Sequence, residues 1–248
     1  MDKLSWDVAV LAANSSSIAY CDGKEAKPQF TAMGFTTHKF LNKDGAQAHL
    51  CGNKEFALIA CRGTQPTELN DLLADLNTIP KRHGPGFVHS GFRGEARKLW
   101  DDILLFAERR QNMPIIVCGH SLGAAMATYI AQELSWHGIK NITLYTFGSP
   151  RLGNDDYVDA MDIPHWRFVN NNDSVCRIPP SVLGFRHHGE LKYINHFGNI
   201  RPTTRWQRWK DRVRGFWAAL KKGQFFDSFY DHSMDHYVKK TKKAALGK

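Results

Sequence analysis

The chain has 248 residues, of which 42% are hydrophobic and 23% are charged, so it is long enough to bury one substantial core. The sequence holds no run of 18 or more apolar residues, which excludes a membrane-spanning helix. The net charge of +9 comes from the C-terminal end, because residues 1–200 hold 20 basic and 20 acidic residues and the last 48 hold 13 basic and 4 acidic ones.

The five cysteines are an odd number and show no CxxC or CxxH spacing. A disulfide framework or a zinc site would show paired or regularly spaced cysteines, so we expect reduced, mostly buried thiols. The opening stretch MDKLSWDVAVLAANSSSIAY contains an early acidic residue and interrupts its apolar run with polar ones, unlike a secretory signal. We therefore expect a cytoplasmic location, with secretion left open only for a chain whose signal has been removed.

Apolar residues spaced three and four apart predict a first helix over residues 4–20. Strand and helix patterns then alternate, which favours an α/β fold with a mainly parallel sheet, helices on both faces and a single domain over residues 1–248. The predicted strands cover residues 30–42, 48–52, 55–63, 114–119, 141–148, 165–171 and 189–195. The longer predicted helices that follow cover residues 91–110 and 123–138.

A serine stands between two glycines in the stretch GHSLG at 119–123, directly after a predicted strand. A strand, a GxSxG turn and a helix in succession are typical of a nucleophile elbow, in which the glycines let neighbouring chain pass close to the serine. We therefore predict Ser121 as a nucleophile rather than a simple helix cap. The backbone N–H of Leu122, at the start of the next helix, is then expected to stabilise an oxyanion.

A serine nucleophile needs a base and an orienting acid, and in this fold both follow it in the chain. Asp173 comes just after the strand predicted at 165–171 and before a Pro-Pro turn, so we predict it as the acid. Asp155 and Asp156 are its rivals, but acidic residues at that place more plausibly begin a short helix.

The histidines that follow the predicted acid are His187, His188, His196, His232 and His236. The first two precede a predicted strand, which favours structural roles. His232 and His236 stand four apart and share one face if that segment is helical. We predict His232 as the base, because a loop there would leave its ring free to move a proton, and His236 is the alternative. A metal held by the pair would need a third ligand that the sequence does not offer.

Seven motifs occur in one order along the chain: ACRGT at 60–64, LLADL at 72–76, VHSGF at 88–92, GHSLGAA at 119–125, FGSPRLGN at 147–154, VNNNDSVCRIPP at 169–180 and DHSMDHY at 231–237. On these motifs the chain resembles the class 3 lipases, the fungal-lipase-like α/β-hydrolases, over most of its length. The resemblance implies an α/β-hydrolase fold with Ser121, Asp173 and His232 as the catalytic triad. It also implies Thr64 as the second oxyanion donor, through its backbone N–H.

In class 3 lipases the stretch after this threonine is a lid over the serine. Here it reads QPTELNDLLADL, residues 65–76, in which Leu69, Leu72 and Leu73 could line one face of a short helix. The stretch is short and polar at its start, so a modest lid over an esterase-like cleft fits it as well as a lid opened by a lipid interface. An ordinary surface helix is the alternative.

The expected function is hydrolysis of acylglycerol-like or small carboxylic esters by a lipase or esterase, through an acyl-enzyme and without a metal or organic cofactor. Phospholipase A1-type and short-acyl esterase activities are alternatives within the same chemistry. A catalytically silent, lipase-like binding protein is the alternative of another class. The intact set of serine, acid, histidine and oxyanion residues favours the enzyme.

The basic C-terminal part contains a stretch, residues 203–222, whose pattern predicts an amphipathic helix. The apolar stripe of this helix consists of Trp206, Trp209, Val213, Phe216, Trp217 and Leu220. Packing of the stripe on the sheet is the more frequent arrangement, and peripheral contact with an anionic membrane is the alternative. No nucleic-acid motif accompanies the basic residues, so we expect no nucleic-acid partner, and the oligomeric state is left open.

Overall fold

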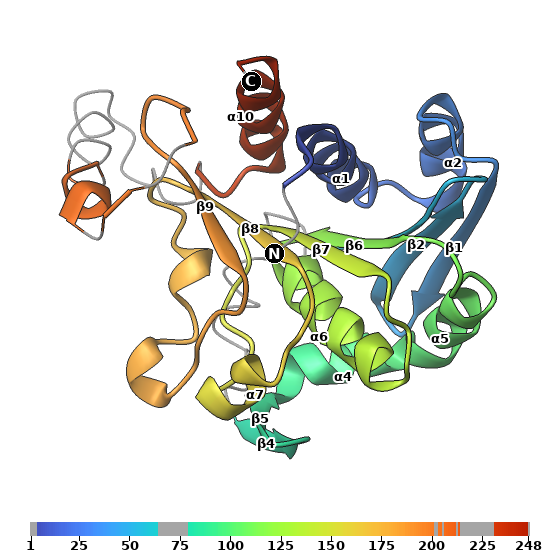
Figure 1. The fold of residues 1–248 in the computed structure, drawn as a ribbon, viewed down its shortest axis with the longest axis horizontal. Helices are drawn as coiled ribbons and strands as arrows, with labels where there is room; N and C mark the ends of the chain where they lie inside the picture. The colour runs from blue at the N-terminus through green and yellow to red at the C-terminus, as the bar shows by residue number, and fades with distance from the viewer. Residues whose placement is uncertain are drawn as a thin grey trace.

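The computed structural model describes residues 4–63, 79–200, 203, 204, 206–211, 213 and 231–247. In this part of the chain the main feature is a seven-stranded sheet with the order β1-β2-β3-β6-β7-β8-β9 (Figure 1). The strands are β1 Thr37–Lys43, β2 Ala46–Gly52, β3 Ala57–Cys61, β6 Ile115–His120, β7 Ile142–Phe147, β8 His165–Asn170 and β9 Glu190–Ile194. β1, β2 and β3 pair antiparallel, and every pair from β3 to β9 is parallel, so the predicted mainly parallel sheet is confirmed.

Helices cover both faces of this sheet, as predicted (Figure 1). On one face lie α1 Trp6–Ile18 and α10 Met234–Leu246, which contact each other, and on the other lie α4 Ser90–Lys98, α5 Trp100–Glu108 and α6 Leu122–Trp136. Successive strand residues point to opposite faces, so Leu58 packs on the α1 side and Ile59 on the α6 side. β3 and β6 are therefore buried at every position, as expected for central parallel strands covered on both sides.

Two predicted elements differ from the structure. The predicted strand 30–42 starts only at Thr37, because its first residues belong to a short helix, α2 Gly23–Ala32, which the Asp22 side chain caps. The predicted helix 91–110 breaks into α4 and α5 at Leu99, which is fully buried between them. The apolar spacing continues through this turn, so the sequence pattern gave no sign of the break.

The remaining described elements connect the sheet to its surroundings. A separate hairpin consists of β4 Pro80–His83 and β5 Gly86–His89, and the predicted short helix after Asn154 is α7 Asp155–Asp159. Two 3₁₀ turns, η1 Val175–Arg177 and η2 Ser181–Leu183, follow β8. Of the helices described, none has the length and apolar character needed to cross a bilayer.

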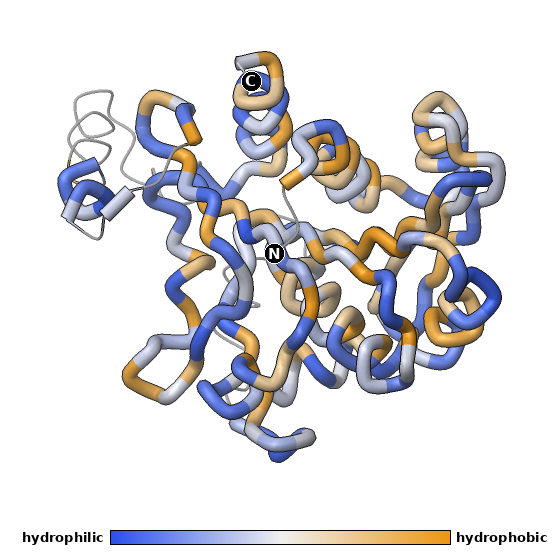
Figure 2. The backbone as a smooth tube through the Cα atoms, viewed as in Figure 1, coloured by the Kyte–Doolittle hydropathy of each residue, from blue (hydrophilic) through white to orange (hydrophobic). Residues whose placement is uncertain are grey.

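Residues 206–211 of the predicted basic amphipathic stretch are helical. Packing of the whole apolar stripe on the sheet is wrong for its first two members, because Trp206 is 59% exposed and Trp209 is 53% exposed. Figure 2 shows this turn as mainly hydrophilic on the hydropathy scale, beyond β9 at the edge of the fold. Phe216, Trp217 and Leu220 lie outside the described residues.

Three histidines are buried in the fold away from the triad candidates. Burial lowers the pKa of His49 and of His89 to about 4, and burial, followed by the nearby His188, lowers the pKa of His165 well below its usual value. Two stacked rings bury part of the His49 ring, whose centroid lies 4.7 Å from that of Phe40 and 5.2 Å from that of His38. All three are therefore neutral in the folded protein at pH 7.

We predict that the free energy of unfolding falls as the pH is lowered from about 6.5 to about 4.5. In this window histidines of the unfolded chain bind protons, with pKa values of about 6.5, whereas the buried ones in the folded chain do not. Urea unfolding followed by circular dichroism at several pH values measures the effect. Paired carboxylates titrate at lower pH, so a flat stability curve between pH 7 and 5 would contradict the prediction.

Candidate active site

The serine of GHSLG lies in a strained turn between β6 and α6. Ser121 has φ 57° and ψ −129°, a backbone conformation that is rare for a residue with a side chain, and it is buried. A Cβ atom on Gly119 would lie 2.3 Å from the carbonyl oxygen of Gly123, and one on Gly123 would lie 2.4 Å from that of Cys61. Only glycine fits at both positions, so the turn has the geometry that the sequence predicted for an elbow.

The turn presents a free end of helix α6 beside the serine. Leu122 is the first residue of α6, so its N–H has no acceptor within the helix, and the helix dipole favours negative charge there. Gly63, which follows β3, reaches the same place, because a Cβ atom on it would lie 2.5 Å from the His120 carbonyl and 3.3 Å from the Ser121 Cβ. Thr64 and the predicted lid residues Leu69, Leu72 and Leu73 lie outside the described residues.

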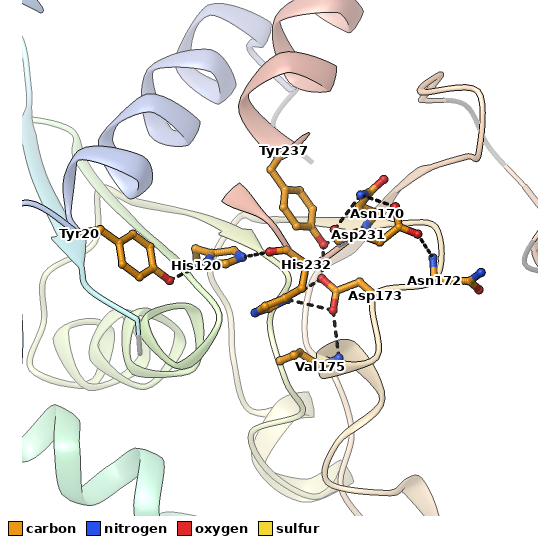
Figure 3. Close-up of polar contacts among 9 residues, drawn as sticks. All are labelled: Tyr20, His120, Asn170, Asn172, Asp173, Val175, Asp231, His232 and Tyr237. Atoms are coloured by element: carbon orange, nitrogen blue, oxygen red, sulfur yellow. Dashed lines mark hydrogen bonds and ion pairs between the residues drawn. The ribbon is translucent and has the colours of Figure 1, made fainter. Parts of the chain in front are cut away.

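Asp173 and His232, 59 residues apart in the chain, form a buried hydrogen-bonded pair (Figure 3). The Nδ1 atom of His232 lies 2.9 Å from Oδ2 and 3.0 Å from Oδ1 of Asp173. Burial by itself would raise the pKa of Asp173, but the adjacent His232 and the hydrogen bonds from His232 and Tyr237 outweigh it and hold that pKa below its usual value. The carboxylate is thus charged and only accepts, so Nδ1 carries the proton and Nε2 is left as an acceptor in the neutral ring.

Ser121 and this pair both lie against the chain at the end of β7. The Ser121 N–H donates to the Phe147 carbonyl at 3.1 Å, and a Cβ atom on the next residue, Gly148, would lie 2.8 Å from Asp173 Oδ2 and 2.9 Å from the His232 ring. The Ser121 Oγ and the His232 Nε2 are both buried, and among the described residues neither has a hydrogen-bond partner. The Ser121 backbone and the Asp173–His232 pair therefore contact two consecutive residues of the chain, Phe147 and Gly148.

His120, next to the serine, holds the backbone of His232. Its Nε2 lies 2.7 Å from the His232 carbonyl and its Nδ1 lies 2.7 Å from the Tyr20 hydroxyl (Figure 3). Burial, and then the nearby His232, lower the pKa of His120 to about 3, so the ring is neutral. Because a carbonyl only accepts, Nε2 must donate, and Nδ1 therefore accepts from Tyr20. Sequence reasoning missed this contact, since nothing local links position 20 to position 120.

A second set of contacts fixes the acid and the loop before α10. The Tyr237 hydroxyl donates to Asp173 Oδ2 at 2.6 Å and accepts from the Asn170 N–H at 3.0 Å. The Asn170 side chain donates to the Asp231 carbonyl at 2.7 Å, and the Asn172 N–H donates to the Asp231 carboxylate at 3.0 Å (Figure 3). These residues join the end of β8 to both ends of the His232 turn, and no local sequence pattern indicates this role for any of them.

The alternative candidates lie elsewhere. Asp155 and Asp156 are exposed in the first turn of α7, and Asp155 pairs with Arg186 at 3.0 Å. His236 lies in the first turn of α10, one turn beyond the ring that contacts Asp173. His187 donates to the Cys176 carbonyl at 2.8 Å, and no group of three or more metal-ligating side chains occurs among the described residues.

The comparison with protein families agrees with these motifs. The model of the family described as class 3 lipase matches residues 58–183, which are 126 of the 248 residues. The chain belongs to the class 3 lipase family. The match includes the elbow and Asp173 of this class 3 lipase, whereas His232 lies beyond its end.

The class 3 lipase is similar to fungal enzymes over part of their length. The lipase of Rhizopus niveus is 32% identical over 155 residues, 56% of this chain and 40% of that protein. The secreted mono- and diacylglycerol lipase 1 of Fusarium solani is 36% identical over 111 residues, 40% of this chain and 32% of that protein. The chain thus spans less than half the length of these relatives.

A solved triacylglycerol lipase, described as having a serine-protease triad as its catalytic centre, shares the fold. The two superpose with a TM-score of 0.67 at 24% identity, over 76% of this chain and 79% of the other. The α/β-hydrolase fold expected from the sequence is therefore confirmed.

The expected cytoplasmic location is wrong. Relatives from Fusarium solani and Penicillium cyclopium are named secreted lipases, which contradicts it. The unpaired cysteines misled the prediction: Cys51, Cys61, Cys118 and Cys176 are free but buried, and burial raises the pKa of Cys118 to about 12. Thiols that are neither ionised nor accessible resist oxidation in any compartment, so their lack of pairing does not report the redox environment.

We predict that Gly148→Ala destabilises the protein more than Gly184→Ala. Both glycines have positive φ, so each substitution costs about 1–2 kcal/mol of backbone strain, but a Cβ atom has no neighbour within 4 Å at Gly184. At Gly148 it collides with Asp173 and His232, which adds about 1–3 kcal/mol of overpacking. Urea unfolding of the two variants measures the difference, and equal losses would show that the buried pair can move away from β7.

Proposed function

We propose that this class 3 lipase is a serine hydrolase that cleaves the carboxylic esters of acylglycerol-like lipids. The observation that carries the proposal is the buried Asp173–His232 pair, which lies against Gly148, while the Ser121 N–H donates to the preceding residue, Phe147. The His232 Nε2 and the Ser121 Oγ are both buried and without a hydrogen-bond partner among the described residues. A hydroxyl, an imidazole and a carboxylate in that succession are the elements of acyl transfer through a covalent intermediate.

In the proposed reaction His232 Nε2 takes the proton of Ser121 as Oγ attacks the ester carbonyl carbon. The Asp173 carboxylate stabilises the imidazolium that forms, and the N–H groups of Leu122 and Thr64 donate to the oxyanion of the tetrahedral intermediate. Collapse of this intermediate releases the alcohol, which receives the proton from His232, and leaves the acyl group on Ser121. A water deprotonated by His232 then attacks the acyl-enzyme, and His232 returns the proton to Ser121 Oγ as the fatty acid leaves. No step needs a metal or an organic cofactor.

The substrate class follows from the family and from the relatives. Two of them are named for acylglycerols, and the proposed oxyanion and acid–base groups serve any carboxylic ester, so phospholipase A1-type and short-acyl substrates share the mechanism. Ser121 is 1% exposed, so a substrate needs an opening above it. We propose that the stretch containing Leu69, Leu72 and Leu73 is a lid whose movement gives the substrate access to Ser121.

We also propose that residues 1–248 form a single catalytic domain. We further propose that this domain works at lipid surfaces, because residues 201–222 hold eight basic residues and one acidic residue together with exposed tryptophans. Basic helices rich in tryptophan bind the boundary between water and anionic lipid.

The triad assignment predicts that Ser121→Ala abolishes labelling by a fluorophosphonate probe. His232→Ala and Asp173→Asn are each expected to lower kcat/KM for a soluble p-nitrophenyl ester by about 10³-fold or more, because the base or its orienting carboxylate is lost. His236→Ala is the matched control, four residues along the same segment, and is expected to stay within about threefold of the parent.

Two results would decide against the proposal. Absence of an adduct on Ser121 in the parent protein would favour a lipase-like binding protein without turnover. A large loss of activity in His236→Ala together with an active His232→Ala would move the base to His236.

A further inference from the structure

The helical turn at residues 206–211 carries two exposed tryptophans on one side. Trp206 and Trp209 stand three residues apart, and their rings stack with centroids 4.7 Å apart and an angle of 7° between planes. The Lys210 ammonium lies 5.1 Å from the centre of the Trp206 ring. Both tryptophans are more than half exposed, so two stacked indole rings with a cation near one of them lie on the water-exposed surface.

The opposite side of this turn is attached to the fold by its acidic residue. The Asp211 carboxylate is buried and accepts from the His196 N–H at 2.8 Å and from the Tyr193 hydroxyl at 3.0 Å. The Tyr193 hydroxyl also lies 3.3 Å from the side-chain oxygen of Asn171. Asp211 is the single acidic residue of the stretch 201–222, and its carboxylate is held inside the fold by these contacts.

The position of the turn relates it to the proposed active site. Tyr193 lies near the end of β9 and Asn171 directly follows β8, two residues before Asp173. The tryptophans thus lie on the side of the sheet formed by the carboxyl ends of its parallel strands, which is also the side of the candidate triad. Figure 1 shows the turn in orange, outside β9. Phe197, which follows His196, is 61% exposed and adds a third aromatic ring near this edge.

From this arrangement we propose that Trp206 and Trp209, with Lys210, form a docking surface for an anionic phospholipid bilayer. Indole rings settle at the boundary between headgroups and acyl chains, while lysine and arginine contact the anionic headgroups. Docking through this surface would bring the strand ends, and the site proposed there, toward the lipid. The role of this docking in catalysis rests on the proposed function, but binding to the bilayer requires no ester hydrolysis.

The test measures binding of the full chain with Ser121→Ala, so that no lipid is consumed, to two kinds of vesicle. One kind is phosphatidylcholine alone, and the other contains about one third phosphatidylglycerol. We expect stronger binding to the second, weakened by salt, and a loss of about tenfold or more in Trp206→Ala/Trp209→Ala, because two large aromatic surfaces no longer enter the interface. Lys210→Glu is expected to weaken binding to the anionic vesicles alone.

The matched control is Leu105→Ala, which removes an exposed apolar side chain from α5 near the other edge of the sheet and is expected to leave vesicle binding unchanged. Thermal unfolding shows that each variant is folded. Parent-like vesicle binding by the double tryptophan variant, or equal binding to the two vesicle types, would overturn the proposal. Hydrolysis of a soluble ester by the protein with Ser121 intact is measured separately, so that a failure of the catalytic proposal is distinguished from a failure of docking.

Discussion

The hydrogen bond between the Asp173 carboxylate and the His232 ring is the contact around which this end of the molecule is organised. A buried carboxylate is costly unless donors surround it, and here the His232 ring, the Tyr237 hydroxyl and the Val175 N–H all donate to it. The donors come from the turn before α10, from α10 itself and from the loop after β8. The hydrogen bonds to the Asp173 carboxylate therefore hold α10 and the turn before it against the end of β8.

The same requirement explains why the neighbouring polar groups are neutral or paired. Burial, and then the nearby His232, lower the pKa of His120 so that its ring is neutral, and this ring donates to the His232 carbonyl while accepting from Tyr20. The ring that we propose as the base is thus held at two points, by its side chain through Asp173 and by its backbone through the residue next to Ser121. Such double support limits the rotation of the imidazole and orients its free nitrogen.

Family membership and the particular features of this chain lie in different parts of the sequence. The class 3 lipase match ends at residue 183, so it includes the strained serine and the acid but not His232 or the exposed tryptophans. The relatives that match in sequence are also much longer than the matched region. The excess positive charge is concentrated in the C-terminal part, beyond the residues that the family model matches.

The sequence by itself determined the features that depend on neighbouring residues: the strand–GxSxG–helix elbow, the alternation that gives a parallel sheet, and Asp173 after its strand. These follow from local sterics and from periodicity, which act over a few residues. Only the tertiary structure decided that His232 rather than His236 contacts Asp173, that Tyr20 and Tyr237 support the pair, and that the first two tryptophans of the stripe face water. Helical spacing makes the two histidines equivalent and defines a stripe without saying what covers it, because both outcomes depend on contacts between segments distant in the chain.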